Sequence, residues 1–239
     1  MNPAINPDAK ARLDAVLSRL NAATQRSGNT ARLLAVSKLQ RGDAVAELAA
    51  CGQTAFGENY VQEGVTKRRE LEAAGLSGNA APLEWHLIGP LQSNKAELAA
   101  KHFDWVQSVD RAKLIPLLAK GRSAEAAPLN VLIQVNIDDE ASKSGCRPEE
   151  VPALADLIAA QPALALRGLM AIPAPHPDIE KRREAFAKMR QLFEALRRGH
   201  PGVDTLSMGM SDDFELAIEQ GATMVRVGTA LFGPRPAKA

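Results

Sequence analysis

With 239 residues, of which 46% are hydrophobic and 24% charged, the chain is long enough to bury a full core and has the composition of a globular protein. A formal net charge of +1 and an aromatic content of 4% argue against a nucleic acid-binding surface and against attraction to an anionic membrane. Cys51 and Cys146 lack metal-ligand spacing and are too few for a disulfide scaffold, so both are expected to be reduced and unreactive. Residues 1–10 lack the apolar segment of a signal peptide, and no run reaches membrane-spanning length, so we expect a cytoplasmic protein.

Helical and strand-like patterns alternate along the chain. An amphipathic helix is expected over residues 7–27, with Asp8 as its N-cap and Gly28 at its end. Short apolar segments then predict eight strands, at 33–38, 53–57, 84–89, 105–109, 129–137, 166–172, 203–208 and 224–227. Helical patterns follow them at 42–50, about 60–74, 93–101, 110–123 (capped by Asp110), 148–160, 179–196 and 212–220. In the 179–196 helix, Ile179, Phe186, Met189, Phe193 and Leu196 fall on one face, which predicts its buried side.

This alternation predicts the fold. Strands separated by helices pair in parallel, and eight such units in a chain of this length favour a closed barrel over an open sheet. We therefore expect an α/β protein, a single (β/α)8 TIM-like barrel with an extra N-terminal helix. No linker or low-complexity segment divides the chain, so residues 1–239 are predicted to form one domain.

In such a barrel the functional residues lie at the C-terminal ends of the strands. Lys38 ends the first predicted strand, and a partly desolvated amine there can attack an aldehyde or a ketone. The segments Ser207-Met208-Gly209 and Gly228-Thr229 follow strands seven and eight, where glycine lets a backbone approach closely and helix N-terminal amides attract an anion. The alternative is that Lys38 only reaches for water and that both segments are ordinary turns.

A lysine and a phosphate-binding loop at one barrel mouth together predict a phosphorylated aldehyde, held as an imine. Both a phosphosugar and pyridoxal phosphate satisfy this description. Arg226 ends the eighth strand, where its guanidinium could donate to a pyridine nitrogen and keep that nitrogen unprotonated, which favours pyridoxal phosphate. An ion pair at the barrel rim is the alternative role for Arg226.

Several long motifs resemble those of a known family. They are Leu34-Ala35-Val36-Ser37-Lys38, Phe56-Gly57-Glu58-Asn59-Tyr60-Val61-Gln62-Glu63, Trp85-His86-Leu87-Ile88-Gly89-Pro90-Leu91-Gln92-Ser93-Asn94-Lys95, Lys143-Ser144-Gly145, Gly168-Leu169-Met170, Leu206-Ser207-Met208-Gly209-Met210-Ser211-Asp212-Asp213 and Val225-Arg226-Val227-Gly228-Thr229-Ala230-Leu231-Phe232-Gly233. In these segments the chain resembles the pyridoxal phosphate homeostasis protein family, the bacterial members related to human proline synthetase co-transcribed protein.

The resemblance implies a role for each candidate residue. Lys38 would form an imine with pyridoxal phosphate, and Arg226 would lie near the pyridine nitrogen. Phosphate contacts are implied for Ser207, Gly228 and Thr229. The remaining cofactor-binding residues expected in the pocket are Asn59, His86, Met170 and Met208.

The family is similar in fold to the N-terminal barrel of alanine racemase, which defines the main functional alternative. A two-base racemase needs a second acid or base, commonly a tyrosine from an added domain. The one tyrosine here, Tyr60, lies in a predicted helix start, and the chain ends soon after the barrel closes. His86 could replace it, but a structural histidine bonded to the backbone is favoured. We therefore expect a monomeric protein, not an efficient enzyme, that holds pyridoxal phosphate and delivers it to apoenzymes; a weak amino-acid racemase and a class I aldolase for a phosphosugar are the alternatives.

Other charged residues are expected to have structural roles. Lys95 and Lys143 lie near strand-end loops and could form transient imines, although solvated charges are favoured. Glu58 is expected to cap the helix from Asn59 onward rather than contact a cofactor.

Two further charged groups are assigned to helix surfaces. Asp212 and Asp213 are expected in the first turn of the helix after strand seven. The cluster Lys67-Arg68-Arg69 is expected to be a solvated helix face, balanced by nearby glutamates.

Overall fold

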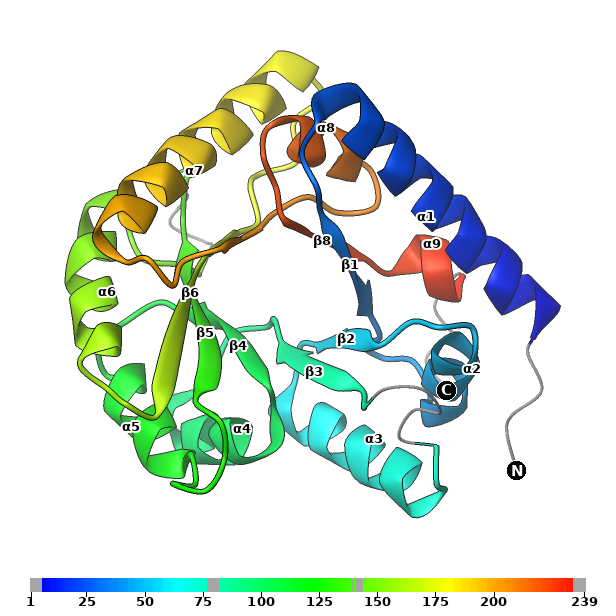
Figure 1. Ribbon diagram of the computed structural model, residues 1–239, viewed down its shortest axis with the longest axis horizontal. Coiled ribbons are helices and arrows are strands. Elements are labelled where there is room, and N and C mark those ends of the chain that lie inside the picture. Colours follow the sequence, from blue (N-terminus) through cyan, green and yellow to red (C-terminus); the bar gives the residue numbers. More distant parts are fainter. Residues whose placement is uncertain (1–5, 77–81, 139, 141–143, 234–239) are drawn as a thin grey trace.

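The computed structural model describes residues 6–76, 82–138, 140 and 144–233, and its eight strands form a closed parallel barrel. The strands are β1 Arg32–Val36, β2 Ala55–Glu58, β3 Glu84–Leu87, β4 Trp105–Val109, β5 Leu129–Val135, β6 Leu164–Ala171, β7 Thr205–Ser207 and β8 Met224–Val227. Neighbours in the chain are neighbours in the sheet, and β8 pairs with β1 to close the ring (Figure 1). The predicted fold is confirmed, and every predicted strand is present.

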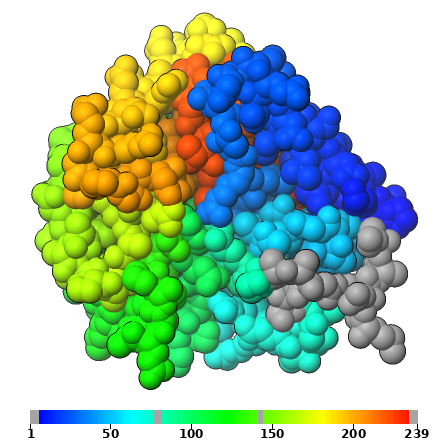
Figure 2. Space-filling view, viewed as in Figure 1, coloured from blue at the N-terminus to red at the C-terminus, as the bar shows by residue number. Residues whose placement is uncertain are grey.

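Helices surround the barrel. They are α1 Pro7–Ser27, α2 Gly42–Ala50, α3 Val61–Ala73, α4 Ala96–His102, α5 Leu114–Gly121, α6 Val151–Ala159, α7 Ile179–Gly199, α8 Phe214–Glu219 and α9 Thr229–Phe232, with short 3-10 turns η1 Ser93–Lys95 and η2 Pro148–Glu150. The extra N-terminal helix α1 packs against α8 and α9. Figure 2 shows blue N-terminal residues beside orange-to-red residues from the C-terminal part of the chain. Among the described residues, no helix combines the length and apolar character needed to cross a membrane.

Alternate strand residues face either the helices or the barrel interior, as the pleat requires. The large core between strands and helices includes Leu33, Trp85 and Leu87. Inside the barrel, Leu34, Ala55, Ile88 and Met224 form one apolar cluster, and Trp105, Leu132 and Met170 form another. The lower interior is thus filled with side chains, and polar residues near the strand ends can form a site above it.

Three local predictions are wrong. The N-cap of α1 is Asn6 rather than Asp8: Asn6 Oδ1 accepts from the amides of Asp8 and Ala9, because Pro7 occupies the first helical position. Helix α5 begins at Leu114, so Asp110 lies too far upstream to cap it. Ile179 is 49% exposed, because the buried face of α7 begins only in its second turn, at Ala185.

Candidate functional site

A cavity of about 610 Å³ opens at the C-terminal ends of the strands, where the fold places binding sites. Its volume is in the range of ligand pockets, about 300–1,000 Å³. Segments that follow or end seven of the eight strands contribute to it. The lining residues are Val36, Lys38, Asn59, Ile88, Gly89, Pro90, Gln134, Ser144, Ile172, Met210, Ser211, Asp212, Arg226, Gly228 and Thr229.

The structure brings together five of the nine residues that the sequence analysis assigned to the site. Lys38, Asn59, Arg226, Gly228 and Thr229 line the cavity. The other four do not line it and are fully buried: His86, Met170, Ser207 and Met208. Met170 packs with Trp105 and Leu132 inside the barrel, and Met208 belongs to the outer core.

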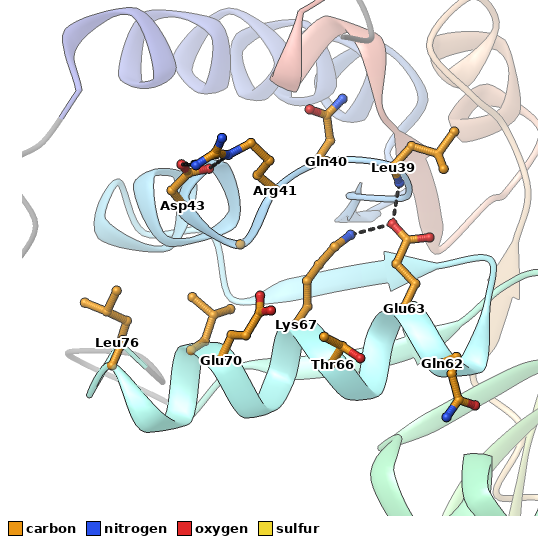
Figure 3. Close-up of a pocket in the computed structure, with 13 residues that line it drawn as sticks. Leu39, Gln40, Arg41, Asp43, Gln62, Glu63, Thr66, Lys67, Glu70 and Leu76 are labelled. Atoms are coloured by element: carbon orange, nitrogen blue, oxygen red, sulfur yellow. Dashed lines mark hydrogen bonds and ion pairs between the residues drawn. The ribbon is translucent and has the colours of Figure 1, made fainter. Parts of the chain in front are cut away.

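Lys38 lies two residues beyond the end of β1, on a half-buried turn. Both sides of the turn are held by hydrogen bonds. The Ser37 hydroxyl donates to Glu58 Oε1 at 2.6 Å, and the Ser37 carbonyl accepts from Lys67 Nζ at 2.7 Å. On the other side, the Leu39 amide donates to Glu63 Oε1 at 2.5 Å (Figure 3). The backbone that carries the candidate nucleophile is therefore fixed.

The anchors of this turn form a buried ionic cluster. Lys67 Nζ lies 2.7 Å from Glu58 Oε1 and 2.8 Å from Glu63 Oε1, with the Glu58 side chain fully buried. Burial raises the pKa of Glu58, although Lys67 and Ser37 oppose that rise. The prediction that Lys67 belongs to a solvated face is thus wrong. Glu58 has a structural role, but it supports the β1 turn and does not cap α3, whose N-cap is Tyr60.

Arg226 forms part of the cavity floor and is only 3% exposed. Its Nη1 donates to Ser207 Oγ at 2.7 Å, and its Nη2 donates to the Ala171 carbonyl at 2.8 Å. Burial lowers the pKa of Arg226 to about 10, with Asp213 opposing the shift, so the guanidinium remains charged at neutral pH. Within the described part of the chain no carboxylate lies at ion-pair distance from Arg226. The cation therefore faces the cavity without a direct counter-ion, and the rim ion pair considered from the sequence is not found among these residues.

Small and polar residues that follow β7 and β8 also line the cavity. Gly228 precedes the short helix α9, which starts at Thr229, and Ser211 and Asp212 lie in the segment between β7 and α8. Helix α8 begins at Phe214, so neither Asp212 nor Asp213 lies in its first turn as predicted. Asp213 instead accepts from the Met210 amide at 2.7 Å and so shapes this loop.

The sequence analysis missed several lining residues, among them Gln134, Ser144 and Ser211. Ser211 lies in the same motif as Ser207, and the motif alone does not tell which of the two serines faces the cavity. Gln134 follows from the two-residue period of β5, which points alternate residues inward. Its Oε1 is buried and has no hydrogen-bond partner among the described residues.

Two lysines that were considered as further imine formers have different positions. Lys95 lines a neighbouring cavity of about 410 Å³, which shares Asn59 and Pro90 with the larger one. Its Nζ lies 3.5 Å from Gln62 Oε1. Lys143 lies outside the described residues.

A separate groove of about 730 Å³ lies between α2 and α3 on the other side of the Lys38 turn (Figure 3). Four of its charged side chains, Arg41, Asp43, Glu63 and Lys67, are already paired. Arg41 contacts Asp43, and Lys67 has three oxygen acceptors, Ser37 O, Glu58 Oε1 and Glu63 Oε1. An ammonium with all three hydrogens donated cannot act as a nucleophile. The groove therefore lacks the chemistry of the mouth cavity.

The residues of the mouth cavity fit a phosphorylated aromatic aldehyde. Lys38 would supply an amine for the carbonyl carbon, and Arg226 would supply a donor for a ring nitrogen. Gly228, Thr229 and Ser211 supply close backbone approach and hydroxyl donors for an anion. Gln134 Oε1 offers an acceptor without a described partner.

Comparisons with known proteins show which family the chain resembles. Residues 11–236 match the family described as alanine racemase, N-terminal domain. The pyridoxal phosphate homeostasis protein of Haemophilus influenzae is 56% identical over 212 residues, which cover 88% of this chain and 87% of that protein. The protein of the same name from Escherichia coli is 51% identical over 223 residues, 92% of this chain and 94% of its own length.

Solved structures add a liganded relative. PipY of Synechococcus elongatus PCC7942, solved with PLP bound, is 35% identical, with a TM-score of 0.77 over 94% of this chain and 100% of that one. Alanine racemase from Corynebacterium glutamicum shares the fold at 24% identity, with a TM-score of 0.60. The match covers 95% of this chain but 63% of that racemase.

Proposed function

The chain belongs to the pyridoxal phosphate homeostasis protein family, built on the alanine racemase N-terminal domain, and we propose that it holds pyridoxal phosphate on Lys38 as an imine. Pyridoxal phosphate is its cofactor, as the PLP-bound relative and the names of the homologues support. The observation that carries the imine is the position of Lys38 in the mouth cavity, on a turn held by buried hydrogen bonds.

The chemistry of holding and release requires only amine exchange. The Lys38 amine adds to the aldehyde carbon, and one water leaves as the imine forms. An incoming primary amine then adds to the same carbon, and Lys38 leaves as a free amine. A reactive aldehyde is thereby kept from other amines yet stays transferable, which is the physical basis of the proposed buffering and delivery to apoenzymes in the cytoplasm by a monomer.

The remaining residues orient the cofactor. Arg226 would donate to the ring nitrogen, and Gly228, Thr229 and Ser211 would bind the phosphate. When bound, the cofactor supplies an electron-withdrawing ring, but a ring nitrogen that accepts from a guanidinium is unprotonated and withdraws electrons weakly. Ser207 acts from beneath, through Arg226, rather than on the phosphate as the sequence suggested.

Weak racemization is the second candidate, because the fold is that of alanine racemase. The homologues are named for homeostasis and not for a reaction. The titratable side chains among the described lining residues are Lys38, Asp212 and Arg226. Tyr60 is 60% exposed and lines the neighbouring cavity instead. We therefore propose a role without efficient catalysis.

Absorbance of the loaded protein tests the proposal. After incubation with pyridoxal phosphate and gel filtration, the wild-type protein should keep a visible imine absorbance, and Lys38→Ala should lose it. Lys95→Ala is the matched control, since it removes a neighbouring lysine outside the cavity, and it should stay as coloured as wild type. A Lys38→Ala protein that remained equally yellow would place the imine on another lysine.

A further inference from the structure

Polar side chains cross the barrel interior in one continuous hydrogen-bonded chain. Arg226 Nη1 donates to Ser207 Oγ at 2.7 Å, and Ser207 Oγ donates to Gln107 Oε1 at 2.7 Å. Gln107 Nε2 lies 2.9 Å from His86 Nδ1, and His86 Nε2 lies 2.6 Å from Glu84 Oε1. Strands β8, β7, β4 and β3 contribute these residues in turn. The expectation that His86 lines the pocket or bonds to the backbone is replaced by this position.

The donors and acceptors allow the protons in this series of hydrogen bonds to be donated in only one direction, from Arg226 toward Glu84. A guanidinium can only donate, so the Ser207 oxygen accepts from Arg226 and its single proton goes to Gln107 Oε1. The amide nitrogen of Gln107 also can only donate, so His86 Nδ1 must be the acceptor. The proton of a neutral His86 is then on Nε2, where it is donated to the Glu84 carboxylate. A reversed Gln107 amide would leave the Ser207 proton without this acceptor.

Burial and charge support this arrangement. His86 is fully buried, and burial lowers its pKa while Glu84 partly opposes that change, which favours the neutral ring. Burial alone would raise the pKa of Glu84, but His86 and Arg32 hold it down to about 2. His86 also stacks on Trp105, with ring centroids 5.2 Å apart, so its plane is fixed. This series of hydrogen bonds therefore has a cation, Arg226, at one end and an anion, Glu84, at the other.

We propose that Gln107 is a positioning residue, which acts through the Ser207 hydroxyl to fix the guanidinium of Arg226 under the ring nitrogen of the cofactor. This inference rests on the proposed function. A serine hydroxyl rotates freely unless its proton has an acceptor, and Gln107 Oε1 is the acceptor here. With that proton fixed, the Ser207 lone pairs face Arg226, and the Ala171 carbonyl fixes the second guanidinium nitrogen. His86 keeps the Gln107 amide in the orientation that this requires.

The direction of the chain can be tested on the protein without cofactor. Nitrogen-15 NMR of labelled histidine should show His86 with a protonated Nε2 and an unprotonated Nδ1. A proton on Nδ1 of His86 would mean that the hydrogen bond with Gln107 runs in the opposite direction, and would overturn the inference. This test does not depend on cofactor binding, so its failure is distinguishable from failure of the proposed function, which would appear as absent imine absorbance in the wild-type protein.

The positioning role can be tested with Gln107→Met, which keeps the volume and removes the hydrogen bonds to Ser207, His86 and the Met224 sulfur. We expect pyridoxal phosphate to bind about tenfold more weakly, as for loss of one charge-assisted hydrogen bond. The absorbance of the bound cofactor should also become pH-dependent, because the ring nitrogen can now take a proton. Leu132→Met, a buried change elsewhere in the barrel interior, is the control and should change neither property.

A double-mutant cycle separates positioning from a general packing effect. In an Arg226→Lys background the guanidinium is already gone, so Gln107→Met should produce no further weakening or pH dependence. Additive effects of the two substitutions, or a Gln107→Met protein with wild-type affinity and spectrum, would overturn the inference. If Gln107→Met does not fold, Ser207→Ala removes the same anchor of Arg226 and is compared in the same cycle.

Discussion

Lys67 holds the turn that carries Lys38 through its contact with the Ser37 carbonyl. Its ammonium contacts two carboxylates and the Ser37 carbonyl while only 6% of its side chain is exposed. Removal of one partner from a buried ion pair leaves the other charge uncompensated, at a cost of about 3–5 kcal/mol. This residue therefore supports both stability and the position of the nucleophile.

Lys67→Met should lower the free energy of unfolding by about 3–5 kcal/mol at neutral pH. The pKa of Glu58, already raised by burial in the folded chain, should rise further without Lys67. A carboxyl with a raised folded pKa binds its proton more tightly when folded, so its penalty is absent below the ordinary glutamate pKa and grows as pH rises through it toward the folded value. Urea unfolding at acidic and neutral pH measures this difference, and Arg69→Met, at an exposed position of the same helix, should cost little at either pH. An equal loss at both pH values would contradict the role of Glu58.

The thiols give a second prediction at this scale. Burial, with a smaller contribution from Glu150, raises the pKa of Cys146 to about 12, so the thiolate is almost absent at neutral pH. Alkylation of the folded protein by iodoacetamide should therefore leave Cys146 unmodified, while the half-buried Cys51 reacts slowly. Mass spectrometry after denaturation should find both cysteines modified. Rapid labelling of Cys146 in the folded protein would contradict its burial.

At the residue scale, the sequence indicated which strand ends carry polar residues, but not how far below the cavity mouth each side chain lies. Lys38, Arg226 and Thr229 lie in the cavity as their strand-end positions indicated. Ser207 and His86 also lie at inward-facing strand positions, but periodicity does not tell how far below the mouth a side chain lies. Lys67 was misjudged, although a signal existed: it lies three residues after Gly64 and four before Leu71, both buried on the same helical face.

Strand β6 shows how one element sets the geometry of the site. Its register with β5 shifts between Leu166 and Gly168, so the strand bulges at Arg167. Gly168 has a φ of 144°, and a Cβ there would overlap the carbonyl oxygen of Thr205. The bulge precedes Ala171, whose carbonyl anchors Arg226. The backbone conformation of Gly168, which other residues rarely adopt, therefore lies just before the Ala171 carbonyl that holds Arg226 in the cavity floor.

Gly168→Ala should destabilise the protein by at least about 2 kcal/mol, because both the backbone conformation and the contact with β7 become strained. Denaturant unfolding measures this loss. The matched control is Gly199→Ala, in the last turn of α7, where a Cβ meets no atom within 4 Å and stability should be nearly unchanged. Equal stabilities of the two variants would show that β6 tolerates a side chain at the bulge.

Element boundaries followed the sequence only in part. The limits of β4, β8, α1 and α2 agree with the periodic patterns. Strand β1 ends at Val36, before Lys38, where the Ser37 carbonyl accepts from the Gln40 amide in a turn and also from Lys67. The contact with Lys67 joins residues 30 positions apart, which no local pattern contains. The β6 bulge likewise includes a close approach of Gly168 to the Thr205 carbonyl of β7, which no local pattern contains.

For the whole molecule, the regular alternation of strands and helices was sufficient to predict the closed barrel. A parallel barrel also requires the strand ends to converge, and this places Lys38, Arg226 and Thr229 in one cavity despite their separation in the chain. The alternation does not predict what the loops enclose. The larger groove between α2 and α3 contains Lys67, whose ammonium already donates to three oxygens, so cavity volume alone does not identify the candidate site.

The proposed function predicts little turnover by the bound cofactor. With L-alanine in deuterated water, the loaded protein should exchange the α-hydrogen no faster than free pyridoxal phosphate does, since the described lining lacks a tyrosine as second acid or base. NMR of the alanine α-proton measures the rate. Faster exchange that is lost in Asp212→Asn would favour the racemase alternative and assign that carboxylate the role of base.

The imine on Lys38 is tested most directly by chemical trapping. The loaded protein is reduced with borohydride, digested and mapped by mass spectrometry, with the Lys38→Ala protein treated in parallel. The account predicts one stoichiometric pyridoxyl-phosphate adduct, on the peptide that contains Lys38, and none in the variant. A principal adduct on Lys95, Lys143 or any other lysine, or no adduct in a protein that retains its cofactor, would contradict it.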